Sequence, residues 1–89
     1  MTIRTVALTL EQANSFFADL RHTIALTECA FCIGIADPAL RGVIAIGRVD
    51  ADTAKMLHFC TDGVEGGYTM LYGSAWRAAK ALGYKAMVL

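Results

Sequence analysis

A glycine-rich stretch at residues 60–69 constrains this chain more than any other feature of its sequence. It lies between a short apolar run, residues 56–60, and a long helical pattern, residues 70–82, so it predicts a strand, a turn and a helix. Glycines at such a junction let the backbone take a positive φ, and the start of the helix offers unpaired N–H groups at the positive end of its dipole. The arrangement is typical of a site for a phosphate or pyrophosphate.

The turn differs from the two commonest phosphate-binding motifs. A P-loop needs a Lys followed by Ser or Thr at the helix start, and a dinucleotide-binding fingerprint needs G-x-G-x-x-G with an acidic residue about 20 positions later. Neither is present, and what remains is Gly63-x-x-Gly66 followed by Gly67, Tyr68 and Thr69. Two interpretations stay open, an anion-binding cradle of another type and a flexible turn before an ordinary helix.

Apolar periodicity predicts the other elements. We expect strands at residues 3–8, 30–36, 42–49, 55–60 and 84–89, helices at 10–21 and 70–82, and a short helix at 24–26. Thr9-x-x-Gln12 is a capping box at the start of the first helix, and Gly83 stands where glycine commonly ends a helix. The turn at 37–42 contains Pro38 and Gly42, which predicts an antiparallel hairpin.

The expected strand at 55–60, helix at 70–82 and strand at 84–89 predict a right-handed crossover in which the two strands are parallel. The expected fold class is therefore α/β, with helices packed on a mixed sheet. Its first strands are antiparallel, and strands four and five are parallel.

Several blocks of the sequence resemble the Gcn5-related N-acetyltransferase (GNAT) family. They are residues 60–63, 71–73, 75–79 and 81–84, with weaker similarity at 8–14 and 31–34. In that family a [Q/R]-x-x-G-x-[G/A] loop wraps the pyrophosphate of acetyl-CoA; here Gly63 replaces the usual Gln or Arg, and Tyr68 replaces the second small residue. The similarity is to a bacterial and phage subgroup of largely unassigned substrate, which suggests a phage or another mobile element as the origin.

The resemblance implies the N-terminal half of a GNAT fold, with acetyl-CoA as cofactor and its pantetheine arm in a gap between strands four and five. The implied cofactor-binding residues are Phe59, Cys60, Thr61, Gly63, Val64, Glu65, Gly66, Gly67, Tyr68 and Thr69. A typical GNAT continues with a further helix and two strands, which often supply a catalytic Tyr. We therefore expect residues 1–89 to form a single GNAT-like domain that lacks this C-terminal part.

Three side chains near the turn bear on function, and two of them have two interpretations each. His58 on the expected fourth strand is the candidate catalytic base for an amine nucleophile, or a plain strand histidine. Asp62 either caps the turn or orients a substrate amine. Glu65 is favourable near a helix N-terminus, but its charge opposes a bound pyrophosphate.

The three cysteines include Cys29 and Cys32 in C-x-x-C spacing. This spacing fits a redox pair or half of a zinc site, although no second ligand pair is present to complete four ligands. The alternative is that both are small core residues, as we expect for Cys60. We expect no bound metal.

Composition limits the partners. The net charge is zero and no Lys/Arg cluster is interleaved with aromatic residues, which argues against nucleic-acid binding. No apolar run reaches the roughly 18 residues of a membrane span, and no signal peptide is recognisable, so we expect a cytoplasmic protein without membrane association. Because 56% of the 89 residues are hydrophobic, we expect a homodimer or a protein partner to cover apolar surface.

Two functions from different classes follow. The first is a minimal N-acetyltransferase that binds acetyl-CoA and acylates an amine. The alternative is a non-catalytic, GNAT-derived interaction module whose apolar surface binds a protein partner.

Overall fold

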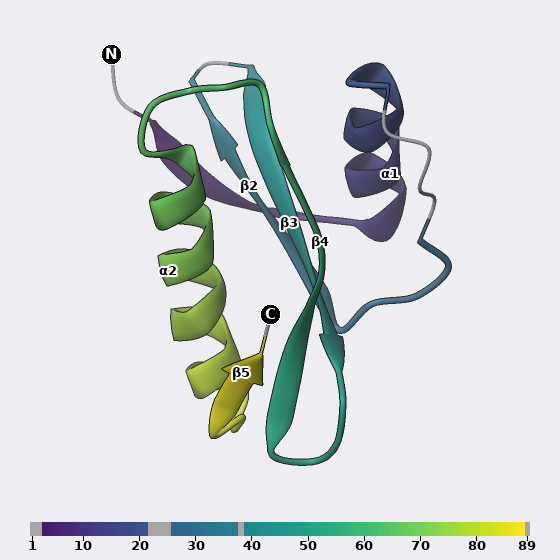
Figure 1. Cartoon of the computed structure of the whole chain (residues 1–89), viewed down its shortest axis with the longest axis vertical. Helices are drawn as coiled ribbons and strands as arrows, with labels where there is room; N and C mark the ends of the chain where they lie inside the picture. The colour runs from purple at the N-terminus through teal and green to yellow at the C-terminus, as the bar shows by residue number, and fades with distance from the viewer. Residues whose placement is uncertain (1–2, 22–25, 38, 89) are drawn as a thin grey trace.

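Five strands form one mixed sheet in the order β1-β2-β3-β4-β5 in the computed structural model, which describes residues 3–21, 26–37 and 39–88 (Figure 1). The strands are β1 (Arg4–Leu8), β2 (Phe31–Ala36), β3 (Leu40–Arg48), β4 (Thr53–Thr61) and β5 (Ala86–Val88), and the helices are α1 (Leu10–Asp19) and α2 (Gly67–Ala81). Strands β1 to β4 pair antiparallel, whereas β4 and β5 pair parallel. The expected α/β class and sheet arrangement are confirmed.

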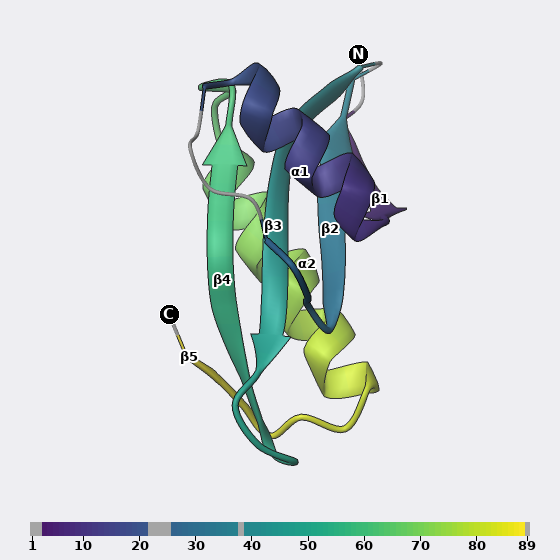
Figure 2. The ribbon, with the colours of Figure 1, turned by 90° about the vertical axis from the view of Figure 1, so that its right-hand side faces the viewer.

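The two helices lie on opposite faces of the sheet (Figures 1 and 2). Successive residues of a strand point to opposite faces, so β3 supplies both halves of the core. Val43 and Ala45 pack in a cluster with Phe17 of α1, whereas Ile44 and Ile46 pack with Leu71 of α2. These two clusters are named the α1-face and α2-face clusters below.

The start of α1 and the end of α2 follow local sequence signals. The Gln12 N–H donates to Thr9 Oγ1 over 3.1 Å and the Thr9 N–H donates to Gln12 Oε1 over 2.9 Å, so the predicted capping box is confirmed. At the end of α2, Gly83 has φ +100° and the N–H of Tyr84 donates to the Ala79 carbonyl over 3.0 Å. This is the Schellman arrangement that a terminal glycine favours.

Several predicted boundaries are wrong by a few residues. Helix α1 ends at Asp19 instead of residue 21, β3 begins at Leu40 instead of Gly42, and β4 extends over Thr53–Thr61. Strand β5 is shorter than the expected 84–89, because Tyr84 completes the end of α2. In the expected short helix at 24–26, residues 24 and 25 lie outside the described residues and Leu26 is not helical. Pro38 and Leu89 also lie outside them.

Helix α2 begins at Gly67, three residues before the expected start at residue 70. Gly67, Tyr68 and Thr69 are therefore its first turn and not part of the preceding loop. A Cβ atom on Gly67 would lie 2.9 Å from Val64 Cγ1, so close packing of the helix start against the turn requires a glycine here. Because glycine has a low helix propensity, the sequence pattern did not indicate that the helix begins here.

Candidate functional site

Strand β4 has an open edge over most of its length. Strand β5 pairs with it only at Thr53, Ala54 and Lys55. From Met56 to Thr61, β4 pairs with β3 on one side and with no strand of the described residues on the other. The unpaired backbone groups of such an edge are able to bind an extended ligand.

A β-bulge interrupts β4 at Leu57. Ala45 of β3 pairs with His58 while the next residue, Ile46, pairs with Met56, so Leu57 is the extra residue. As a result Leu57 packs against the α1-face cluster, and the His58 ring meets Phe17 of α1 edge-on, with 4.6 Å between centroids. Two successive side chains thus lie on the same face of the sheet.

The turn after β4 is held by hydrogen bonds to both of its ends. Asp62 Oδ1 accepts from the Val64 N–H over 3.1 Å, and Asp62 Oδ2 accepts from Arg41 Nε of β3 over 2.7 Å. Thr61 Oγ1 accepts from the Gly63 N–H over 3.2 Å. Asp62 therefore caps the turn, as one of its two interpretations predicted, and its charge is balanced by Arg41.

Gly63 and Gly66 have φ values of +94° and +75°, a backbone conformation that side chains with a Cβ rarely adopt. A Cβ on either residue would meet no protein atom within 4 Å. Steric crowding therefore does not explain why glycine occurs at these two positions. The positive φ explains it, and the absence of nearby protein atoms leaves space for a ligand on the outer side of the turn.

The N-terminus of α2 lacks a side-chain cap. Gly66 is the N-cap residue, and the first turn contains no acidic side chain. The N–H groups of Tyr68 and Thr69 have no acceptor within the helix, because the first N–H groups of any helix are left unpaired. The dipole of this 15-residue helix adds positive potential at the same point.

Aromatic side chains extend from this point along α2. The Phe59 and Tyr68 rings meet edge-on at 4.8 Å, and the Tyr68 and Tyr72 rings stack at 6.0 Å. Trp76 follows four residues later, and Lys80 Nζ lies 5.3 Å from its ring centroid. The i, i+4 spacing places these side chains on one stripe of the helix. Tyr68 was among the predicted cofactor-binding residues, whereas Tyr72, Trp76 and Lys80 were not, although their i, i+4 spacing is visible in the sequence.

The remaining site candidates divide between the two faces. Phe59 and Val64 pack against the α2-face cluster, and Glu65 is exposed beside the turn. Cys60 is buried in the α1-face cluster; burial first, then the charge of Asp62, raises its pKa. His58 is half-buried on that same face. Only the backbone of Cys60 is therefore available to a ligand on the α2 side.

A cleft of about 950 Å³ is lined mainly by β1 and α1 and by no residue of the turn. A cleft of about 400 Å³ adjoins the bulge, and its lining residues are Glu28, Cys29, Ala30, Gly47, Arg48, Leu57 and Tyr84. The bulge in β4 thus forms part of the wall of a ligand-sized space.

Residues 3–21, 26–37 and 39–88 contain no group of three or more His, Cys, Asp or Glu side chains that could hold a metal ion. Neither of the two described helices is long and apolar enough to cross a membrane.

Comparisons with known proteins identify the fold. No protein-family model matches the sequence, and no curated protein matches it. A ribosomal-protein-alanine N-acetyltransferase from Brucella melitensis biovar Abortus 2308 is similar in structure, with a TM-score of 0.75 and 15% identity over 100% of this chain and 79% of that chain. An aminoglycoside acetyltransferase from an uncultured soil metagenomic sample has a TM-score of 0.71 and 9% identity over 100% and 80%.

An acetyltransferase from Trypanosoma brucei is also similar, with a TM-score of 0.69 and 8% identity over 99% of this chain and 82% of that chain. At these identities the likeness concerns the fold alone. The chain has a GNAT-like fold over the length that these alignments cover.

Proposed function

We propose that this protein binds acetyl-CoA, or a related acyl-CoA, and transfers the acyl group to an amine. The observation that carries the proposal is the uncapped N-terminus of α2 behind a turn with two positive-φ glycines. The fold shared with acetyltransferases supports it.

The pyrophosphate would bind at the turn and the first turn of α2. Its charge matches the helix dipole, and the N–H groups of Tyr68 and Thr69 are suitable donors. Arg41 offsets the carboxylate of Asp62, which removes one source of repulsion. The charge of Glu65 is not offset by an ion pair among the described contacts and reduces the affinity.

The pantetheine arm would follow the open edge of β4. Its amide groups are able to pair with backbone N–H and C=O groups in the manner of an added strand. This path leads from the turn to the bulge at Leu57, where one residue departs from regular pairing with β3. We propose that a backbone N–H at this bulge stabilises the oxyanion of acyl transfer.

Acyl transfer also requires a base for the amine. His58 lies on the α1 face of β4, next to the bulge. Histidine is the side chain whose unperturbed pKa is nearest neutrality, so His58 is the residue that we propose for this role. Replacement by Gln should lower kcat more than it raises KM for acetyl-CoA.

Calorimetric titration with acetyl-CoA and CoA tests the proposal. Asn tolerates positive φ, so Gly66→Asn should retain the turn while its side chain occupies the open space of the site. We expect this variant to bind at least tenfold more weakly. Gly83→Asn is the matched control, because Gly83 also has positive φ and open surroundings but lies at the other end of α2. The absence of binding by the unmodified protein at millimolar CoA would refute the proposal.

The second candidate function is a non-catalytic interaction module or a homodimer. It is favoured by exposed apolar side chains near β5, at the end of α2 and after β3. Their exposed fractions are 64% for Leu82, 56% for Val49 and 45% for Val88. Val88 belongs to β5, which pairs with β4 alone among the described strands. Light scattering should give about twice the chain mass of 9.6 kDa for the dimer. A monomer at every concentration would exclude the homodimer.

A further inference from the structure

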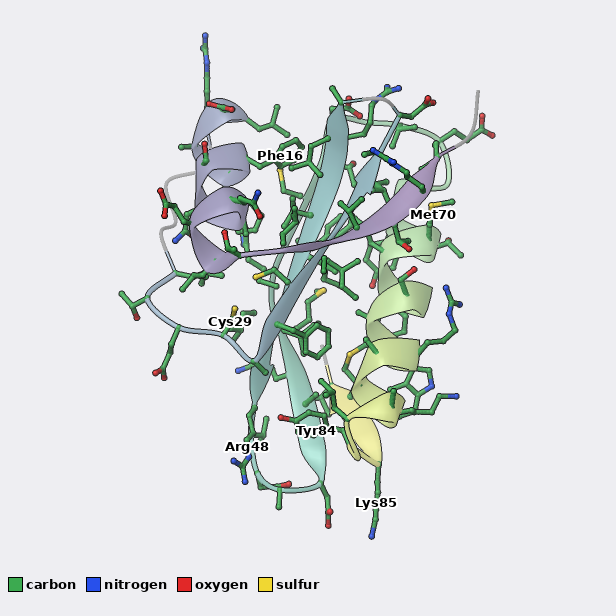
Figure 3. The ribbon with its side chains drawn as sticks, turned by 180° about the vertical axis from the view of Figure 1, so that it is seen from behind. Phe16, Cys29, Arg48, Met70, Tyr84 and Lys85 are labelled. Atoms are coloured by element: carbon green, nitrogen blue, oxygen red, sulfur yellow. The ribbon has the colours of Figure 1, made fainter. Side chains whose placement is uncertain are left out.

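The thiols of Cys29 and Cys32 face each other at the start of β2. Their Sγ atoms are 3.2 Å apart, within hydrogen-bond distance for sulfur. Cys32 belongs to β2, and Cys29 lies in the segment that leads into it (Figure 3). The C-x-x-C spacing thus corresponds to a contact between the two side chains.

The two thiols have different surroundings. Cys32 is 2% exposed within the α1-face cluster, near Phe17 and Val43. Burial, followed by the hydrogen bond and charge of Cys29, raises the pKa of Cys32 to about 12. Cys29 is half-buried and lines the cleft of about 400 Å³, together with Glu28 and Arg48. A small reagent therefore reaches Cys29 through the cleft, whereas Cys32 is protected by α1.

We propose that Cys29 and Cys32 are a reversible dithiol site that a peroxide converts to an intramolecular disulfide, with Cys29 reacting first. The two Sγ atoms must approach from 3.2 Å to about 2.0 Å, a movement within the reach of side-chain rotation. Simple core packing explains the burial of Cys32. It does not explain a second thiol directed at Cys32 from the wall of a cleft.

The reaction balances with one peroxide per pair of thiols. The Cys29 thiolate attacks a peroxide oxygen and the O–O bond breaks, which gives a sulfenic acid and releases an alcohol, or water from hydrogen peroxide. The Cys32 sulfur then attacks the sulfenic sulfur, loses its proton and displaces water. In total two thiols are oxidised, one peroxide is reduced, and the protein loses two hydrogen atoms.

Hydrogen peroxide titration of the reduced protein, followed by intact-mass and non-reducing peptide analysis, tests the site. We expect a mass loss of about 2 Da, a Cys29–Cys32 link within one chain, and full reversal by dithiothreitol. The rate should not depend on protein concentration. Cys60→Ala is the matched control, because Cys60 lies in the same cluster as Cys32. This replacement should leave the reaction unchanged.

Two further variants separate the roles of the thiols. Cys29→Ser should abolish the mass loss, and because Cys29 is the more exposed thiol this variant should stay folded. Cys32→Ala should stop the reaction at a sulfenic acid on Cys29 that dimedone traps, with circular dichroism to verify folding. An unchanged mass in the unmodified protein, a link through Cys60 or a covalent dimer would overturn the proposal.

Discussion

Arg41 and Asp62 are joined twice: Arg41 Nε donates to Asp62 Oδ2 over 2.7 Å, and the Asp62 N–H donates to the Arg41 carbonyl over 2.9 Å. The second residue of β3 thereby fixes the first residue of the turn after β4. About one third of each side chain is exposed, so the ion pair itself adds at most about 1 kcal/mol to stability. We expect the ion pair to matter more for anion binding, because Arg41 offsets the negative charge of Asp62 that a bound anion would meet.

Arg41→Ala should therefore weaken CoA binding more than it destabilises the protein. We expect a dissociation constant about three- to tenfold higher, because Asp62 then repels the pyrophosphate without compensation. Calorimetry measures this change. Arg48→Ala removes the same charge at the other end of β3 and should have little effect; an equal loss in both variants would indicate a general charge effect.

Glu65→Gln should strengthen CoA binding. At about 7 Å in water, removal of one repelling charge is worth about 0.6 kcal/mol, or roughly threefold in affinity. The gain should shrink as salt is added, since ions screen exposed charges. Titrations at low and high salt measure it, with Glu11→Gln of α1 as the control of equal charge. A gain independent of salt would contradict this origin.

Phe17→Ala should destabilise the fold by about 3–5 kcal/mol, because Phe17 is fully buried and its loss leaves a cavity beneath α1. The change also removes the ring that contacts His58. Urea denaturation measures the free energy of unfolding. The neighbouring Phe16 is half-buried, so Phe16→Ala is the matched control and should cost clearly less. Equal costs would mean that the α1-face cluster depends no more on Phe17 than on Phe16.

Alkylation of Cys32 should continue to accelerate with pH where an ordinary thiol levels off. Only the thiolate reacts, and a pKa near 12 means about tenfold more thiolate per pH unit between pH 8 and 10. Iodoacetamide labelling of the reduced Cys60→Ala variant, with peptide mass analysis to separate Cys32 from Cys29, measures this thiol while Cys29 stays in place. By linkage, the raised pKa also makes the native state less stable as pH rises from about 9 towards 12, since the unfolded chain loses its proton first. A plateau near pH 9 in a folded sample would contradict the burial effect.

Local signals made the capping box of α1 and the glycine end of α2 predictable. The amino acids involved lie within a few residues of one another, so sequence spacing alone specifies the hydrogen bonds. The parallel pairing of β4 and β5 was likewise predictable, because a strand–helix–strand unit has one favoured connection.

Other features depend on contacts that spacing does not specify. Arg41 and Asp62 are 21 residues apart, and no local pattern relates them. The bulge at Leu57 breaks the alternation of β4, so the sequence could not assign Leu57 and His58 to one face. Gly67 was interpreted as part of a turn because its packing against Val64 exists only in the folded chain.

The open edge of β4 also sets a length. Five residue steps separate the bulge at Leu57 from Asp62 in the turn, and at about 3.3 Å per residue they span roughly 17 Å. A ligand that contacts both points must be at least that long, whereas a short thioester or a free phosphate can occupy only one of them. The strand would then act as a ruler that distinguishes whole carrier molecules from their fragments.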